Sequence, residues 1–235
     1  MKHSIILLLL LLPLISFCET KDTLSDGKIK IGISGSSDYC YRILKSDETS
    51  KWISDVRDTL EIPKFGYTVS VNILYKIKNN IKIEGAILYS NFGEKTKKYV
   101  LNNSNSADLP ANSSFLYNYR YLGLPLKINY YFYTKKIKLY ATVGLSTNVF
   151  LSKKITSVLE YMNLDTKKSN SISKNGFSKI NFLVIAGLGI NYSISNKFDI
   201  KVEPIYKRSI NTIIKAPIKE YLYSAGLNLG FYYNL

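Results

Sequence analysis

The stretch from residue 121 to residue 145 reads YLGLPLKINYYFYTKKIKLYATVGL, and it decides the fold class. Apolar side chains occupy every second position from Leu122 to Phe132, and again from Leu139 to Leu145. A period of two is typical of β-strands that bury or shield one apolar face. The polar tripeptide Thr-Lys-Lys at 134–136 separates the two runs, as a hairpin turn does. The stretch therefore predicts two long antiparallel strands joined by a short turn.

The same alternation recurs in six other segments, so we expect an all-β chain of eight strands. Each segment has about nine residues or more, which is enough to cross a bilayer as a tilted strand. The predicted strands cover residues 28–40, 65–76, 81–92, 115–133, 137–151, 179–193, 198–207 and 222–235.

The connections between these strands are alternately short and long. An up-and-down barrel places every second connection at the same end, so one rim has tight turns and the other has long loops. Outer-membrane barrels show this arrangement, with the short turns in the periplasm. We therefore predict an eight-stranded antiparallel transmembrane β-barrel. The short turns are 77–80, 134–136 and 194–197, and the long loops are 41–64, 93–114, 152–178 and 208–221.

Alternation alone leaves open which face points outward, because a soluble lipocalin-like barrel has its apolar face inside. The aromatic residues favour the membrane arrangement, since they lie on the apolar faces near strand ends, where a lipid interface would be. The other faces carry glycine, small polar residues and charges, which suit a narrow lumen. The predicted aromatic girdle consists of Tyr67, Tyr75, Tyr89, Tyr130, Phe132, Tyr192, Phe198, Phe231 and Tyr233.

Six charged residues share the predicted lumen face near the short-turn end. They could form a narrow polar gate or a charge network that fills a closed barrel. The second interpretation is favoured, because eight strands leave room only for side chains. The six residues are Lys82, Glu84, Lys127, Lys138, Lys201 and Glu203.

The N-terminus predicts export from the cytoplasm. Lys2 precedes an apolar run at 5–15, which is too short to span a bilayer and fits the core of a signal peptide. Ser16 and Cys18 are the small residues before the expected cut, while Phe17 disfavours the alternative of a lipidated Cys18. The predicted organisation is a signal peptide at 1–18, a short segment at 19–27 and a barrel domain at 28–235.

The mature chain offers little for catalysis. His3, the only histidine, leaves with the signal peptide, so no histidine base is available. Cys40 would be the single remaining cysteine, and no cluster of residues predicts a metal site or a cofactor. The net charge of +15 comes from lysines scattered over turns, loops and strands, so we expect a solvated surface and no nucleic-acid partner.

The segments Tyr121–Lys127, Tyr130–Phe132 and 139–144 resemble the PorT-like and outer membrane β-barrel families of Bacteroidetes. In those families a Tyr-Leu-x-hydrophobic-Pro strand precedes a Tyr-x-Gly strand. The resemblance covers about residues 28–235. It implies an outer-membrane barrel, and for the PorT-like members a link to protein secretion, but it assigns no functional residues.

The sequence predicts a non-enzymatic protein of the outer membrane, with a structural or surface-interaction role through its four long loops. Trp52 lies in the first loop, where it could face a ligand or pack on the barrel rim. The expected partners are outer-membrane lipid and, during insertion, the barrel-assembly machinery, and we expect a monomer. Two alternatives remain open: a component of protein secretion, and a soluble periplasmic binder of lipophilic ligands.

Overall fold

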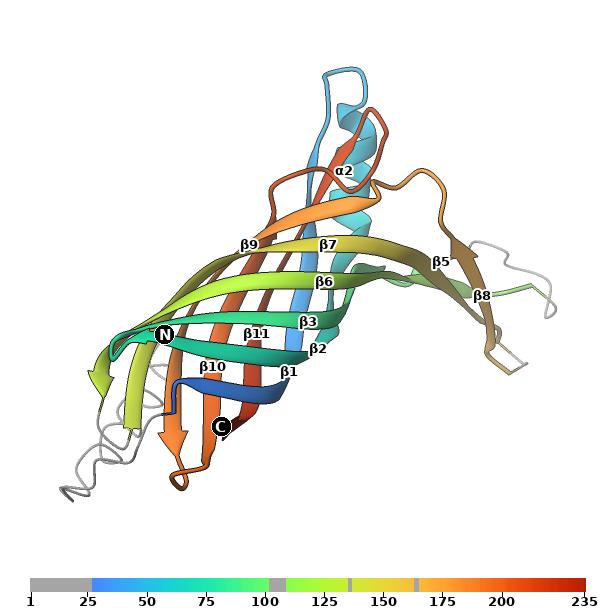
Figure 1. The fold of residues 1–235 in the computed structure, drawn as a ribbon. Helices are drawn as coiled ribbons and strands as arrows, with labels where there is room; N and C mark the ends of the chain where they lie inside the picture. The colour runs from blue at the N-terminus through green and yellow to red at the C-terminus, as the bar shows by residue number, and fades with distance from the viewer. Residues whose placement is uncertain (1–26, 102–108, 135–136, 163–164) are drawn as a thin grey trace, which may run out of the picture.

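The computed structural model describes residues 27–101, 109–134, 137–162 and 165–235, which form a closed antiparallel barrel (Figure 1). Eight long strands make the ring. The first and last of them pair from Lys30↔Asn234 to Lys45↔Lys219, which closes the barrel. The predicted fold is therefore confirmed. The strands are β1 Ile29–Lys45, β2 Glu61–Lys78, β3 Ile81–Phe92, β6 Asn112–Thr134, β7 Ile137–Glu160, β9 Ile180–Ser193, β10 Phe198–Ser209 and β11 Lys219–Asn234.

The apolar side chains point outward and the polar side chains point into the lumen. On β9, for example, Leu188 is 62% exposed, whereas Asn191 is fully buried. Together the outward residues form an apolar band around the barrel, which reaches from the short turns to about Tyr39 on β1 and Phe65 on β2. Such a surface is stable only against lipid. The alternative of a soluble barrel with its apolar faces inward is therefore wrong.

The two ends of the barrel differ as expected. At one end the turns are short, because β2 ends at Lys78 and β3 begins at Ile81. Following the usual orientation of outer-membrane barrels, we call this the periplasmic end and the opposite one the outer end. The predicted signal peptide at 1–18 and the segment up to residue 26 lie outside the described residues.

At the outer end the strands continue well beyond the predicted boundaries. The predicted loop at 41–64 contains the last part of β1, the start of β2 and the helix α2 Lys51–Leu60. The loop at 93–114 contains β4 Glu94–Thr96 and β5 Tyr99–Val100. These segments lie beyond the apolar band, where water surrounds both faces, so the apolar alternation that marks the spanning strands is absent there. In the described part of the chain, no helix is long and apolar enough to span a membrane.

The predicted loop at 152–178 is largely a β-sheet. There β7 continues to Glu160, and β8 Lys167–Ser173 folds back beside it. The first part of β6 pairs with the other side of β7, and β5 pairs with β6. We call this extension of the wall, formed by β5, β8 and the outer parts of β6 and β7, the outer sheet. It projects away from the barrel in Figure 1.

The lumen near the outer end is apolar, which the sequence did not predict. Aromatic rings dominate this cluster: Tyr121 contacts Phe92 and Phe150 edge to face, with ring centroids 6.2 and 5.5 Å apart. These side chains fill the barrel above its polar lower half. The outer apolar cluster consists of Cys40, Phe92, Tyr119, Tyr121, Leu183, Ile213 and Leu222, with Tyr117, Phe150, Phe177 and Ile214 packed against it.

Candidate functional site

Glu84 is the centre of a buried charge layer in the lower lumen. Its carboxylate oxygens lie 2.8 Å from Lys127 Nζ and 2.7 Å from Lys201 Nζ. The β3–β6 register places Glu84 directly opposite Lys127, while Lys201 reaches it from β10 across the lumen. Lys127 Nζ also lies 3.5 Å from Glu203. Of the six residues predicted to form a lumen network, these four are linked in one chain of ion pairs.

The two remaining predicted lysines also lie in the lower lumen, nearer the short turns. Lys82 is buried with its Nζ 4.5 Å from the centroid of the Tyr131 ring. Lys138 is also buried. Sequence reasoning missed one further ion pair here, which joins Lys30 to Asp199. Both of its members alternate in phase with the lumen residues of their strands, so the strand pattern could have revealed them.

Two neutral side chains also donate hydrogen bonds to Glu84. Tyr232 donates its hydroxyl to Glu84 over 3.0 Å, and Asn129 donates its amide over 2.9 Å. Lys201 also lies over the Tyr232 ring, 4.5 Å from its centroid. A buried carboxylate is tolerated when it is paired and hydrogen-bonded. Both carboxylate oxygens of Glu84 are therefore paired, whereas Glu203 Oε1 and Asn129 Oδ1 in the same layer have no hydrogen-bond partner.

A second polar layer crosses the middle of the lumen. Lys207 on β10 lies 2.9 Å from Asp38 on β1, and Thr68 donates its hydroxyl to the same carboxylate over 2.6 Å. A small cavity of about 40 Å³ lies between this layer and Lys127, and it is lined by serine, threonine and asparagine side chains together with apolar ones. The two polar layers and the outer apolar cluster fill the lumen at three successive levels. This arrangement favours a closed barrel over a pore.

The residues of the predicted aromatic girdle all lie on the outside of the barrel. Seven of them are at the periplasmic end, where Phe198 stacks on Phe231 with ring centroids 5.2 Å apart. Only Tyr67 and Tyr89 belong to the outer end. Sequence reasoning missed most of the outer ring, because its members lie in strand ends that were assigned to loops or overlooked. The missed residues are Tyr39, Tyr41, Phe65, Tyr206 and Tyr223.

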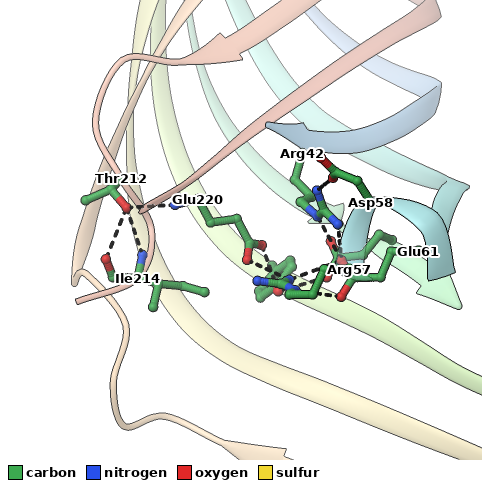
Figure 2. A network of polar contacts seen from close by, with 9 residues as sticks. Arg42, Arg57, Asp58, Glu61, Thr212, Ile214 and Glu220 are labelled. Atoms are coloured by element: carbon green, nitrogen blue, oxygen red, sulfur yellow. Dashed lines mark hydrogen bonds and ion pairs between the residues drawn. The ribbon is translucent and has the colours of Figure 1, made fainter. Parts of the chain in front are cut away.

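The helix α2 is anchored over the outer mouth by Arg57. Figure 2 shows its guanidinium between Glu61 on β2 and Glu220 on β11, with N···O distances of 2.7 and 3.1 Å. Arg42 on β1 also donates to Glu61, over 2.8 Å, and pairs with Asp58 of the helix. The helix thus contributes cationic and anionic groups to one network. We call the ion pairs among Arg42, Arg57, Asp58, Glu61 and Glu220 the outer-mouth network.

Behind this network lies a third buried carboxyl group, that of Glu94 on β4. Tyr119 donates its hydroxyl toward both Glu94 and Glu220, at 3.0 Å in each case. Burial, together with the charges of Glu220 and Glu61, raises the pKa of Glu94 to about 8. Burial alone would lower the pKa of Arg57, but its bonds to Glu61 and Glu220 outweigh this and raise it. At neutral pH the carboxyl group of Glu94 is therefore neutral.

Two further features complete the outer mouth. Thr212 fixes the last outer connection, because its hydroxyl donates to the Ile214 carbonyl and accepts from the Glu220 amide (Figure 2). Trp52 lies on α2 and is 66% exposed. An open groove of about 410 Å³ lies between α2 and the outer sheet, bordered by Arg57, Leu60, Glu61, Thr96, Tyr99, Val100, Leu101, Ser113, Phe115 and Tyr117.

The described residues contain no histidine, and none of their His, Cys, Asp and Glu side chains form a group of three that could hold a metal ion. Cys40 is fully buried within the outer apolar cluster. The arrangement thus offers charged contacts that position α2, and a surface around them.

Comparisons with known proteins agree with this geometry. A family model described as an outer membrane protein beta-barrel domain matches residues 29–215. A comparison with curated proteins finds no match.

Among solved structures, the chain is similar to Neisserial surface protein A at 14% identity, with 88% of this chain and 97% of that chain covered and a TM-score of 0.47. It is also similar to the outer membrane protease OmpT from Escherichia coli (10% identity, 92% and 99% covered, TM-score 0.45). A third similar structure is OprG from Pseudomonas aeruginosa (12% identity, 90% and 98% covered, TM-score 0.42).

Proposed function

We propose that this chain, which belongs to the outer membrane protein β-barrel domain family, is a non-enzymatic surface-interaction protein. It lies in the outer membrane as an integral β-barrel. The observation that carries the proposal is the outer sheet, which extends the barrel wall past the apolar band as paired strands. A paired sheet holds its side chains and its edges in fixed positions, which reduces the entropy lost on binding a partner.

The filled lumen supports a role at the surface rather than in transport. Ion pairs centred on Glu84 cross the lower lumen, and the Asp38–Lys207 pair crosses the middle. Opening a path would require separating buried charges. Breaking a buried ion pair so that one charge is left without its partner costs about 3–5 kcal/mol. We therefore expect no ohmic conductance when the purified protein is inserted into planar bilayers.

Cell attachment tests the proposed function. In the test variant, a two-residue Asn-Gly turn replaces residues 154–172 and joins Lys153 to Ser173. These residues are cross-strand partners, so the turn closes a shorter hairpin and keeps the β6–β7 pairing from Tyr119↔Lys153 toward the periplasmic end, while the outer end of β6 loses its partner. Cells displaying the full chain should attach to protein-coated, polysaccharide-coated or sister-cell surfaces more than cells displaying the variant at equal surface levels. Equal attachment by both would overturn the surface role.

The secretion role that a PorT-like resemblance implies predicts a different result. Deleting the gene should then lower the amount of secreted protein in the medium, and the variant with the shortened outer hairpin should restore it. If attachment is unaffected and secretion falls, secretion replaces surface interaction as the function.

A further inference from the structure

The strand β8 forms one border of the outer sheet. Its seven residues pair with β7 in a continuous register from Lys153↔Ser173 to Leu159↔Lys167. The opposite side of this part of β7 is occupied by β6. Among the residues that the structure describes, β8 pairs with β7 alone. Its other side, which we call the β8 edge, therefore faces away from the sheet.

The β8 edge is a template for a further strand. Alternate residues of an edge strand direct their N–H and C=O groups away from the sheet, and these groups can pair with another extended chain. Six of the seven residues of β8 are exposed, so no covering segment shields them among the described residues. The strand contains no proline and its register has no bulge, two features that commonly block such edges. Its lysines are a third such feature, because they repel another basic strand. At the opposite border, β5 is only two residues long.

The charges near the β8 edge indicate what kind of chain could pair with it. Lys167 and Lys168 begin the strand, two residues after the exposed Asp165, and Lys154 lies at the far end of the hairpin on β7, opposite Ile172. Glu160, the acidic residue that ends β7, is paired with Lys98 at 2.7 Å. Opposite charges stabilise cross-strand pairs and like charges destabilise them. A basic edge therefore favours an acidic strand.

We propose that the β8 edge binds an extended acidic polypeptide segment of a partner protein by strand addition. The proposal rests on the surface-interaction function above and names the partner chemistry for it. Backbone hydrogen bonds would supply affinity, as in other cases of strand addition, and the lysines would select acidic sequences. A second copy of this chain fits less well, because its β8 would bring more lysines to the same edge.

A labelled peptide tests the proposal directly. The probe is a fluorescein-tagged octapeptide of alternating glutamate and threonine, added to the full-length mature chain in detergent micelles and followed by fluorescence anisotropy. We expect saturable binding. The same peptide with every second amide N-methylated should bind at least about tenfold more weakly, since it cannot complete the backbone ladder. A peptide with lysine in place of glutamate should not bind.

Charge reversal on the protein provides the matched comparison. The Lys167→Glu, Lys168→Glu double variant should lose the acidic peptide and gain the lysine peptide. The control carries the same charge change on the barrel rim, Lys45→Glu with Lys219→Glu, a pair that faces each other on β1 and β11. It should bind like the unmodified chain.

Three results would overturn the proposal. Equal binding of the N-methylated peptide would mean simple ionic attraction, and equal binding of the lysine peptide would remove the charge selection. Self-association that disappears in the Lys167→Glu, Lys168→Glu variant, without peptide binding, would identify a second copy as the occupant. If attachment depends on residues 154–172 but not on Lys167 and Lys168, the proposed function is preserved and the strand-addition inference is refuted.

Discussion

Replacing Glu84 by glutamine tests whether the lower charge layer is a structural network. The substitution preserves size but removes the charge that both Lys127 and Lys201 contact, at 2.8 and 2.7 Å. Lys127 retains only the more distant Glu203, at 3.5 Å. Since Glu84 is only 1% exposed, bulk water does not reach the site of the lost charge.

The expected cost follows from this geometry. Removing one partner of a buried ion pair destabilises a protein by about 3–5 kcal/mol. At about 1.36 kcal/mol for each factor of ten, the folding equilibrium constant should fall by a factor of roughly 150 to 5,000. Urea unfolding in detergent micelles, followed by the circular dichroism of the strands, measures this as a lower midpoint.

The control is Glu160→Gln, which removes a carboxylate from an ion pair of similar length. Lys98 and Glu160 lie 2.7 Å apart, but their side chains are 65% and 30% exposed. An exposed pair contributes less than about 1 kcal/mol. If Glu84→Gln cost no more than Glu160→Gln, the lower lumen would have to be hydrated, and the account of a closed, packed barrel would fail.

Three other predictions test the outer mouth and the wall. The pKa of Glu94 is raised to about 8, so the contribution of this residue to folding stability is complete below about pH 4.5 and is lost as the pH rises through 8. The urea midpoint should therefore fall between these pH values. Glu94→Gln should flatten this fall. Gly66→Ala should cost about 1–3 kcal/mol in the same unfolding assay, because its Cβ would lie 2.1 Å from the Asn91 carbonyl oxygen. Gly85→Ala, where nothing lies within 4 Å, should be neutral or stabilising by up to about 1 kcal/mol. Cys40 is fully buried, so maleimide should label it only in urea; rapid labelling of the folded chain would contradict the packing of the outer apolar cluster.

The spanning part of the barrel was predictable because lipid imposes a strict pattern on it. Each outward position there must be apolar, so the period of two in segments such as 121–132 reveals strands, faces and short turns together. The same constraint located Glu84 and Lys127 in the lumen. It could not show that Lys201 reaches Glu84 from the opposite wall, because the sequence orders strands around the ring without fixing contacts across it.

The helix α2 was missed for a related reason. Its outward face carries the large apolar residues Trp52 and Val56, while Arg57 points into the charged outer mouth. A helix normally reveals itself by an apolar face toward a core. Here the core contact is ionic, so the usual pattern is reversed and the segment resembles a charged loop.

These constraints also indicate where function should be sought. Lipid forces the outer face of the spanning strands to be apolar, and a narrow lumen forces its polar residues to pair. Charges such as Glu84 and Lys201 are therefore required by the fold itself and do not imply transport. The outer sheet is subject to neither constraint, because water surrounds its faces and the β8 edge. Seven residues of ordered strand with an unshared edge are not needed to close the barrel, so a binding role explains them better than a structural one.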